Sequence, residues 1–347
     1  MPHSGAHVRD PLREAGVSRL VVFAPNWLGD AVMALPALAD VQRASPTTTI
    51  TVAAGPSVAP LFTMVAGVSE VMSLEPRGSV WGGGSSALAR GRFDAALLLP
   101  NSFHVARLAS RAGIRERWGY ATQWRGALLT RRVAPPSRRH QAAFYQHLTQ
   151  SLGFAPGPLL PVIDLSAEQR ATGVDLLHAA GWDGRTPVVV FAPGAAYGGA
   201  KKWSAGSFSA VATDLARSGI VSVMIGSGGD ARAGAEVEAA LGPGVTVINL
   251  IGRTDLPGLA AVLAASRGLV ANDSGAMHLA AALGVPVTAV FGPTDETATH
   301  PIGRAPTRLL TYPVWCRPCM LRECPLDHRC MTGIVPEAVA MAARSLL

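Results

Sequence analysis

The sequence has few charged residues and no long apolar run. Charged side chains make up 15% of the 347 residues and hydrophobic side chains 49%, a balance typical of a globular protein with a large buried core. No apolar stretch reaches the roughly 18 residues that a membrane-spanning helix needs. Residues 1–17 are polar and lack the apolar centre of a secretion signal. We therefore expect a cytoplasmic protein.

Aromatic residues and familiar nucleotide-binding signatures are also scarce. Aromatic side chains form 6% of the chain, and the sequence contains neither a Walker A loop nor a G-x-G-x-x-G fingerprint. It also carries no nucleic-acid-binding motif. Nucleic acid is therefore the weaker choice of partner.

Positive charge is in excess and is unevenly spread. The formal net charge is +7, and one segment, opposed only by Glu116, holds nine arginines: Arg107, Arg111, Arg115, Arg117, Arg125, Arg131, Arg132, Arg138 and Arg139. Such local basicity indicates an anionic partner, which could be a phosphorylated substrate, an acidic membrane face or nucleic acid. A solvated basic surface is the simpler alternative.

Short apolar runs alternate with helical segments in both halves of the chain. The expected strands are 19–24, 48–53, 70–74, 94–99, 188–192, 220–225, 245–250, 268–271 and 285–291, and the expected helices include 30–43 and 142–152. A proline-rich stretch over 132–161 separates the two series. Continuous apolar strands alternating with helices favour parallel sheets covered on both faces. We predict two doubly wound α/β domains, 1–165 and 166–347.

In such folds ligands bind beyond the carboxyl ends of the strands, so the turns after the apolar runs are the candidate sites. The first such turn places Asp30 at the start of a helix, where a helix N-cap is the simpler interpretation and a general base the alternative. A second turn combines Gly194 with Lys201 and Lys202. Glycine lets the backbone approach a phosphate and lysine supplies charge, although a flexible basic loop would have the same composition.

The third turn, residues 272–278, joins an apolar strand to an alanine-rich helix. A helix N-terminus offers free N–H groups to an anion. Asp273 or Ser274 could instead merely cap the helix. His278 lies one helical turn beyond Ser274 and shares its face, which capping does not require. Two phosphate-compatible turns in the second half together indicate a bound nucleotide diphosphate.

All four cysteines, Cys316, Cys319, Cys324 and Cys330, lie within residues 316–330, together with His328. Their grouping is compatible with four thiolates around zinc or an iron–sulfur cluster, but the spacing differs from that of common zinc sites. Reduced thiols and local disulfides are the alternatives, disulfides being disfavoured in a cytoplasmic protein.

An ordered set of motifs resembles glycosyltransferase family 9, above all the ADP-heptose:lipopolysaccharide heptosyltransferases of the heptosyltransferase II group. The resemblance spans about residues 19–340, and its motifs are Leu28-Gly29-Asp30, Pro193-Gly194, Ala200-Lys201-Lys202-Trp203, Asn272-Asp273-Ser274-Gly275 with His278, and Phe291-Gly292-Pro293-Thr294. It implies a GT-B fold, in which two Rossmann-like domains face each other across a cleft. The N-terminal domain would bind the acceptor and the C-terminal domain the nucleotide sugar.

The resemblance also implies the chemistry: inverting, metal-independent transfer of heptose from ADP-L-glycero-D-manno-heptose to heptosyl-Kdo2-lipid A, with no cofactor. Asp30 would be the general base and Lys201 would neutralise the departing diphosphate. Donor binding would involve Gly194, Lys201, Asp273, Ser274, Gly275 and His278, with Asp230 near the adenosine, and Arg107, Arg111 and Arg125 would bind the acceptor. The acceptor places the enzyme at the anionic inner face of the cytoplasmic membrane. Alternatives are another nucleotide sugar or glycan, or a non-catalytic nucleotide- or nucleic-acid-binding protein.

Overall fold

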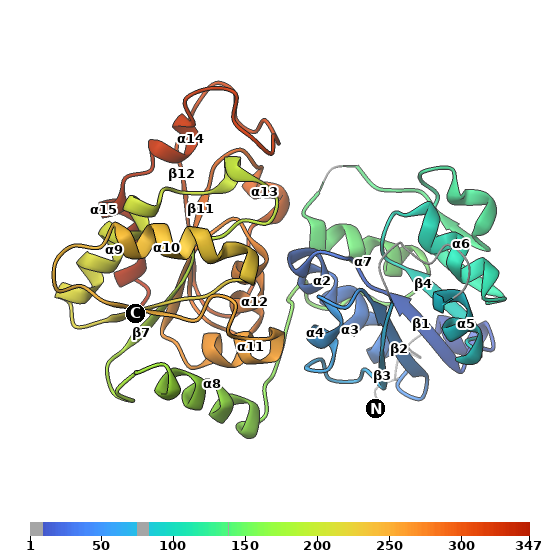
Figure 1. Cartoon of the computed structure of the whole chain (residues 1–347). Coiled ribbons are helices and arrows are strands. Elements are labelled where there is room, and N and C mark those ends of the chain that lie inside the picture. The colour runs from blue at the N-terminus through green and yellow to red at the C-terminus, as the bar shows by residue number, and fades with distance from the viewer. Residues whose placement is uncertain (1–9, 75–82, 138) are drawn as a thin grey trace, which may run out of the picture. The chain divides into compact units, whose positions relative to one another are not determined.

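The computed structural model describes residues 10–74, 83–137 and 139–347. The chain divides into two compact units, Met1–Pro161 and Val162–Leu347, each with its own sheet (Figure 1). The expected domain boundary after residue 165 lies inside the second unit. There the N–H of Ile163 donates to the Ala282 carbonyl at 3.0 Å, and Asp164 lies 3.6 Å from Arg304.

The first unit is a six-stranded parallel sheet in the order β3-β2-β1-β4-β5-β6. Its strands are β1 (Arg19–Phe23), β2 (Thr49–Ala54), β3 (Glu70–Ser73), β4 (Ala95–Leu98), β5 (Glu116–Tyr120) and β6 (Arg131–Val133). Its helices are α1 (Pro11–Glu14), α2 (Leu28–Met33), α3 (Leu35–Ala44), α4 (Ala59–Phe62), α5 (Gly83–Arg90), α6 (Phe103–Arg111), the 3-10 turn η1 (Arg125–Leu128) and α7 (Gln141–Ser151). Figure 1 shows helices on both faces of this sheet, as doubly wound folds require.

The second unit repeats the design with the strand order β12-β11-β10-β7-β8-β9. Its strands are β7 (Val188–Ala192), β8 (Val221–Met224), β9 (Val247–Asn249), β10 (Gly268–Asn272), β11 (Val287–Phe291) and β12 (Thr307–Thr311). Its helices are α8 (Ala167–Ala179), η2 (Gly199–Lys201), α9 (Ala205–Arg217), η3 (Gly228–Asp230), α10 (Ala231–Ala239), α11 (Leu256–Ala264), α12 (Gly275–Ala282), α13 (Glu296–Thr299), α14 (Arg329–Thr332) and α15 (Pro336–Arg344). Every residue of β7, β10 and β11 is buried, because helices cover both faces.

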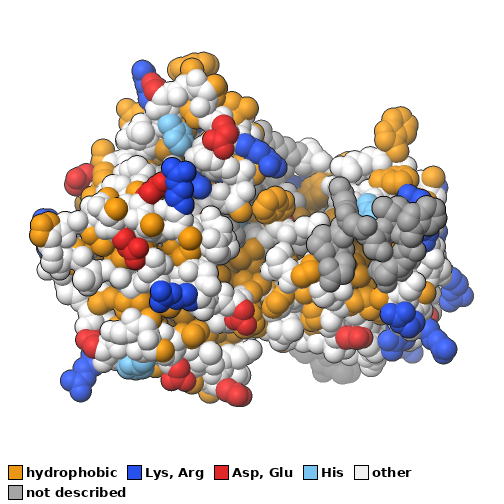
Figure 2. All heavy atoms as spheres, in the orientation of Figure 1, with side chains coloured by type: hydrophobic (Ala, Val, Ile, Leu, Met, Phe, Trp, Pro, Cys, Tyr) orange, Lys and Arg blue, Asp and Glu red, His pale blue; other side chains and the backbone are white. Residues whose placement is uncertain are grey.

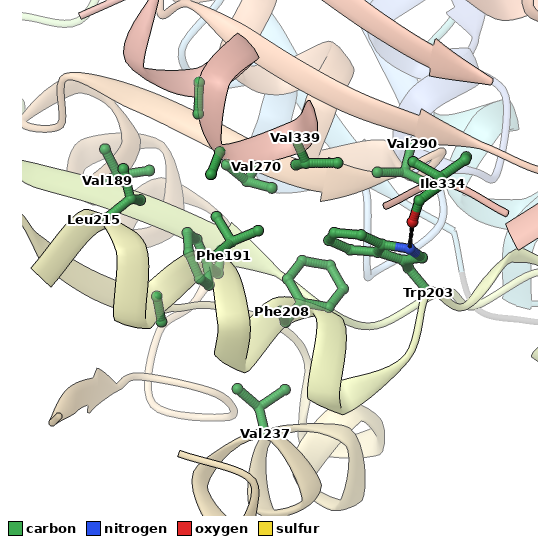
Figure 3. Packing of buried hydrophobic residues seen from close by; sticks show 14 of the residues in the cluster. Val189, Phe191, Trp203, Phe208, Leu215, Val237, Val270, Val290, Ile334 and Val339 are labelled. Carbon is green, nitrogen blue, oxygen red and sulfur yellow. Dashed lines mark hydrogen bonds between the residues drawn. The ribbon is translucent and has the colours of Figure 1, made fainter. Parts of the chain in front are cut away.

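Three aromatic side chains pack among aliphatic ones in the core on one face of the second sheet (Figure 3). Phe191 of β7 packs against Phe208 of α9, with ring centroids 5.9 Å apart. Trp203 meets Phe208 edge to face at 5.3 Å and donates its indole N–H to the Ile334 carbonyl at 3.1 Å. Trp203 thus fixes one end of the loop that precedes α9.

The helix expected over 30–43 is two helices in the structure. They meet at Ala34, and Pro36 lies in the first turn of α3, where its missing N–H is tolerated. The break leaves Asp30 in a short helix of its own. Among the described residues no helix has both the length and the apolar character needed to span a bilayer.

Candidate functional site

A cluster of polar side chains lies at the carboxyl ends of the central strands of the second unit. Strand β10 pairs with both β7 and β11, so the turns that follow these three strands lie at one edge of the sheet. The turn after β7 leads to Lys201, the turn after β10 carries Asp273, and the turn after β11 carries Thr294. The strand order therefore brings together residues far apart in the sequence.

Lys201 and Asp273 form a largely buried ion pair. The Lys201 ammonium lies 2.6 Å from Oδ2 of Asp273, and their side chains are 13% and 6% exposed. The hydroxyl of Thr294 donates to the same oxygen at 2.7 Å. The ammonium also lies 4.7 Å from the ring centroid of Tyr197, a cation–π contact. Because an ammonium has three N–H donors, Lys201 keeps donor capacity beyond its bond to Asp273.

Asn272, the last residue of β10, ties the turns together. Its side chain is fully buried, its Oδ1 accepts the backbone N–H of Trp203 at 3.0 Å, and its Nδ2 donates to the Pro193 carbonyl at 2.8 Å. Sequence reasoning did not assign a role to Asn272 or to Thr294. Their position directly after apolar strands was the available signal.

Helix α12 begins beside Asp273 with the backbone of Ser274 in an extended conformation at the N-cap position. The side chain of Ser274 makes no capping bond, and within the described part of the chain its buried Oγ has no hydrogen-bond partner. The Asp273 carboxylate is engaged by Lys201 and Thr294. The interpretation of Asp273 and Ser274 as residues that merely cap the helix is therefore wrong. A buried hydroxyl without a partner costs about 1–3 kcal/mol, so Ser274 is suited to bonding a ligand.

Gly275 provides the first N–H group of this helix, and His278 lies one turn further on. The His278 side chain is buried, with 4% exposure. The structure therefore brings four sequence-predicted residues, Asp273, Ser274, Gly275 and His278, to one helix start beside Lys201.

Gly194 and Asp230 lie in contact at the neighbouring strand ends. A Cβ on Gly194 would lie 2.0 Å from Oδ1 of Asp230, so a larger residue there would displace the Asp230 carboxylate. Oδ2 of Asp230 accepts the backbone N–H and the hydroxyl of Ser227, at 2.9 and 2.8 Å. Asp230 therefore also shapes the loop after β8.

In the first unit Asp30 lies in the first turn of α2. The N-cap residue of this helix is Trp27, so the interpretation of Asp30 as the N-cap is wrong. The Asp30 side chain is half-buried, and a carboxylate is stabilised near a helix N-terminus. Burial, followed by the negative charge of Asp30, raises the pKa of Tyr145 on α7. Tyr145 therefore lies within electrostatic reach of Asp30.

The three arginines predicted to bind an acceptor lie in different environments. Arg107 and Arg111 are exposed on α6. Arg125 is fully buried: its Nε donates to the Tyr120 carbonyl at 2.8 Å, Nη2 to Oδ1 of Asn101 at 3.1 Å, and Nη1 to the Pro100 carbonyl. Burial lowers the pKa of Arg125 to about 10. In the structure Arg125 holds the turn after β4, whereas the sequence analysis had predicted that it binds the acceptor. Arg138 lies outside the described residues.

The four cysteines are free thiols, three half-buried and Cys330 buried. Burial and then the neighbouring Cys324, Cys316 and Cys319 raise the pKa of the Cys330 thiol. In the described ranges no group of three or more His, Cys, Asp or Glu side chains is arranged to hold a metal ion. The geometry thus gives no support to the zinc or iron–sulfur interpretation.

Sequence and structure comparisons agree on one group of relatives. The profile of glycosyltransferase family 9 (heptosyltransferase) matches residues 85–329. Lipopolysaccharide heptosyltransferase 2 of Escherichia coli K12 is 30% identical over 300 residues, which cover 82% of this chain and 85% of that protein. The Salmonella typhimurium LT2 protein of the same name matches with the same identity and coverage.

The solved structure of E. coli ADP-heptose lipopolysaccharide heptosyltransferase II superposes with a TM-score of 0.81 at 27% identity. The match covers 94% of this chain and 98% of that one. The predicted fold class, two doubly wound parallel sheets of the GT-B type, is therefore confirmed.

Proposed function

Because this chain belongs to glycosyltransferase family 9 and transfers heptose in the synthesis of the lipopolysaccharide core, we propose that its acceptor is heptosyl-Kdo2-lipid A and its donor ADP-L-glycero-D-manno-heptose. The observation that carries the donor half is the buried Lys201–Asp273 pair beside the start of α12. Lysine and a helix N-terminus supply the positive potential that a diphosphate needs.

The donor diphosphate binds at the start of α12. The N–H groups from Gly275 onward and the hydroxyl of Ser274 bond phosphate oxygens, and Lys201 neutralises the charge that develops on the departing ADP. Asp273 contacts the donor sugar, and His278 contacts the phosphates or the heptose hydroxyls. Gly194 lets the backbone approach the nucleotide, and Asp230 lies on the adenosine side. With this positive potential in place the reaction needs neither a metal ion nor a cofactor.

Asp30 is the general base. It removes the proton from the acceptor hydroxyl as that oxygen bonds to the anomeric carbon, while the bond from this carbon to the diphosphate oxygen breaks and ADP leaves. Attack opposite the leaving group inverts the anomeric centre. Asp30 is half-buried in the first turn of α2, where the helix N-terminus favours a negative charge.

We propose that α6 and the turn before η1 contact the acceptor and the anionic inner face of the cytoplasmic membrane. Phe103, Arg107 and Arg111 are exposed at four-residue intervals, so they share one face of α6. Trp124, which is 96% exposed, directly precedes η1, and η1 packs against α6. Figure 2 shows hydrophobic side chains and Lys and Arg side chains on the surface of the first unit. Aromatic and basic residues together favour an anionic membrane interface.

A transfer assay with ADP-heptose tests the function. We expect heptose to reach Kdo2-lipid A that already carries its first heptose, and not the acceptor without it. Transfer to the unsubstituted acceptor alone would assign the chain to the preceding step, and transfer to neither would overturn the proposal.

Two alternatives have different signatures. A family 9 enzyme for another nucleotide sugar would bind UDP or GDP more tightly than ADP in isothermal titration. A non-catalytic binding protein would release no ADP from ADP-heptose, and a nucleic-acid-binding protein would also shift labelled DNA at physiological salt.

A further inference from the structure

We propose that Glu323 and His328 are positioning residues for heptosyl transfer, and that they hold the loop 197–201 so that Lys201 stays beside Asp273. This inference rests on the proposed role of Lys201. Both residues belong to the cysteine-bearing segment, residues 315–330, which follows the last strand of the second sheet and to which the chemistry above gave no task.

The cysteine-bearing segment bonds the backbone of the Lys201 loop at adjacent residues. Oε1 of Glu323 accepts the N–H of Gly199 at 3.0 Å, and the Arg322 carbonyl accepts the N–H of Ala200 at 2.9 Å. Nε2 of His328 lies 2.6 Å from the Ala200 carbonyl. Because a carbonyl only accepts, His328 must carry its proton on Nε2 in this bond. Both polar groups of the Ala200 backbone are thus held by one segment.

The two segments approach too closely for a side chain at Gly198. A Cβ on Gly198 would lie 2.3 Å from the Arg322 carbonyl oxygen, a backbone atom that cannot turn aside as a side chain can. Gly198 therefore allows the backbone of the Lys201 loop to lie against the backbone of the cysteine-bearing segment.

Tyr197 links this contact directly to Lys201. Its hydroxyl donates to the Met320 carbonyl at 2.7 Å. Its ring lies 4.7 Å from the Lys201 ammonium and 5.2 Å from the Arg322 guanidinium. The ring that contacts the proposed catalytic ammonium is therefore fixed by the same segment.

The cysteine-bearing segment also holds the turn after β11, which carries Thr294. Nε of Arg317 donates to the Gly292 carbonyl at 2.7 Å, and the Met320 N–H donates to the Pro293 carbonyl at 2.9 Å. Lys201 and Thr294 lie far apart in the sequence and far from Asp273, yet both donate a hydrogen bond to Oδ2 of Asp273. One segment thus positions both partners of that carboxylate.

Glu323 offers a test because its side chain is exposed and contributes little to the core. Glu323→Ala removes the acceptor for the Gly199 N–H, whereas Glu323→Gln keeps an oxygen at the same place. We expect Glu323→Ala to raise the KM for ADP-heptose about three- to tenfold and to lower kcat, the effect of losing one hydrogen bond of ordinary net strength at an exposed side chain. The KM for the acceptor stays unchanged, and Glu323→Gln restores the donor KM. His328→Ala behaves like Glu323→Ala, and His328→Gln, which keeps an N–H donor, restores part of the effect.

Asp327→Ala is the matched control, because Asp327 lies in the same segment and pairs with Arg329. It should leave the kinetics unchanged, and neither the Glu323 nor the Asp327 substitutions, both at exposed positions, should move the melting temperature by more than about 2 °C. Wild-type donor KM and kcat in Glu323→Ala would overturn the proposal, and so would failure of Glu323→Gln to restore them.

Hydrogen exchange separates this inference from the proposed function. Glu323→Ala should speed exchange of the Gly199 and Ala200 amides relative to wild type and to Glu323→Gln. If exchange accelerates but Lys201→Met transfers heptose normally, the contact exists and the role of Lys201 is wrong. If exchange is unchanged, the positioning role itself is wrong.

Discussion

The Lys201 ammonium and the Asp273 carboxylate lie 2.6 Å apart at the edge of the second sheet, where both side chains are largely removed from solvent. Breaking a buried pair by removing one partner leaves the other charge uncompensated. The Thr294 hydroxyl, 2.7 Å from the same oxygen, limits where the carboxylate can turn. The pair thus fixes a positive group beside the start of α12.

Lys201→Met should lower kcat by about 100-fold or more, because the charge that stabilises the departing diphosphate is lost. Release of ADP from ADP-heptose measures the effect. Lys202→Met, which removes the exposed neighbouring lysine, is the matched control and should retain activity. Normal kcat in Lys201→Met would remove Lys201 from the mechanism.

Asp30→Asn should reduce turnover by about 10²- to 10⁴-fold, the usual contribution of a general base. Binding of ADP should be nearly intact, because Asp30 belongs to the first unit and the proposed diphosphate site to the second. Isothermal titration with ADP and a transfer assay on the same preparation separate the two effects. Near-normal turnover would show that another group accepts the proton.

The central strands could be predicted from the sequence because they are continuous apolar runs. Strand β7 was expected over 188–192 and is observed there, and β11 was expected to begin two residues earlier than it does. Strands β5 and β6 were missed because their charged residues resemble a surface loop. In the structure Arg131 of β6 lies over the ring of Trp118 at 4.6 Å and is 3.8 Å from Glu116. Part of the arginine excess therefore stabilises the first unit.

The turns of the candidate site could also be located, since they follow apolar runs. Their partners could not, because the order of strands in a sheet is not written in local sequence. Asn272 bonds the turn after β7 only because β10 pairs with β7, and Glu323 reaches Gly199 across 124 residues of sequence. The same limit explains Arg125, whose burial depends on the contacts between the turns after β4 and β5.

Arg125→Met should destabilise the first unit by about 2–4 kcal/mol, because it leaves the Tyr120 and Pro100 carbonyls and the Asn101 side chain without their buried donor. Urea unfolding at pH 7 measures the change. Arg107→Met, at an exposed position on α6, should change the unfolding free energy by no more than about 0.5 kcal/mol. Equal effects of the two substitutions would contradict a structural role for Arg125.

Membrane contact should depend on α6 and Trp124. Replacing Arg107 and Arg111 together by alanine should weaken binding to vesicles containing phosphatidylglycerol by about 30-fold at low salt, on the scale of about 1 kcal/mol for each basic residue. Trp124→Ala should weaken binding at low and high salt alike, because its contribution is apolar. Arg232→Ala, at a 91% exposed side chain of the second unit, is the control for net charge. Equal losses in all three variants would rule out a specific surface on α6.

Acid should weaken the first unit through Asp94. Burial opposes ionisation of this carboxyl, but hydrogen bonds from the backbone N–H of Ser18 and Arg19 and from the Ser18 hydroxyl outweigh it and hold the pKa of Asp94 below its ordinary 3.8. All three donors lie 2.9 Å from Oδ2. Because the pKa is lower in the folded protein than in the unfolded chain, the ionised carboxylate stabilises the fold above pH 3.8.

That contribution is lost as the pH falls through the folded pKa. Asp94→Asn removes the charge at every pH, so urea unfolding should show the variant less stable than wild type at pH 7. The difference should shrink below about pH 4, where wild-type Asp94 also becomes neutral. Asp175→Asn, at an exposed position on α8, should leave the pH profile of stability unchanged. A constant difference between Asp94→Asn and wild type from pH 7 to pH 2 would mean that shape and packing, and not the carboxylate charge, join the start of β1 to the start of β4.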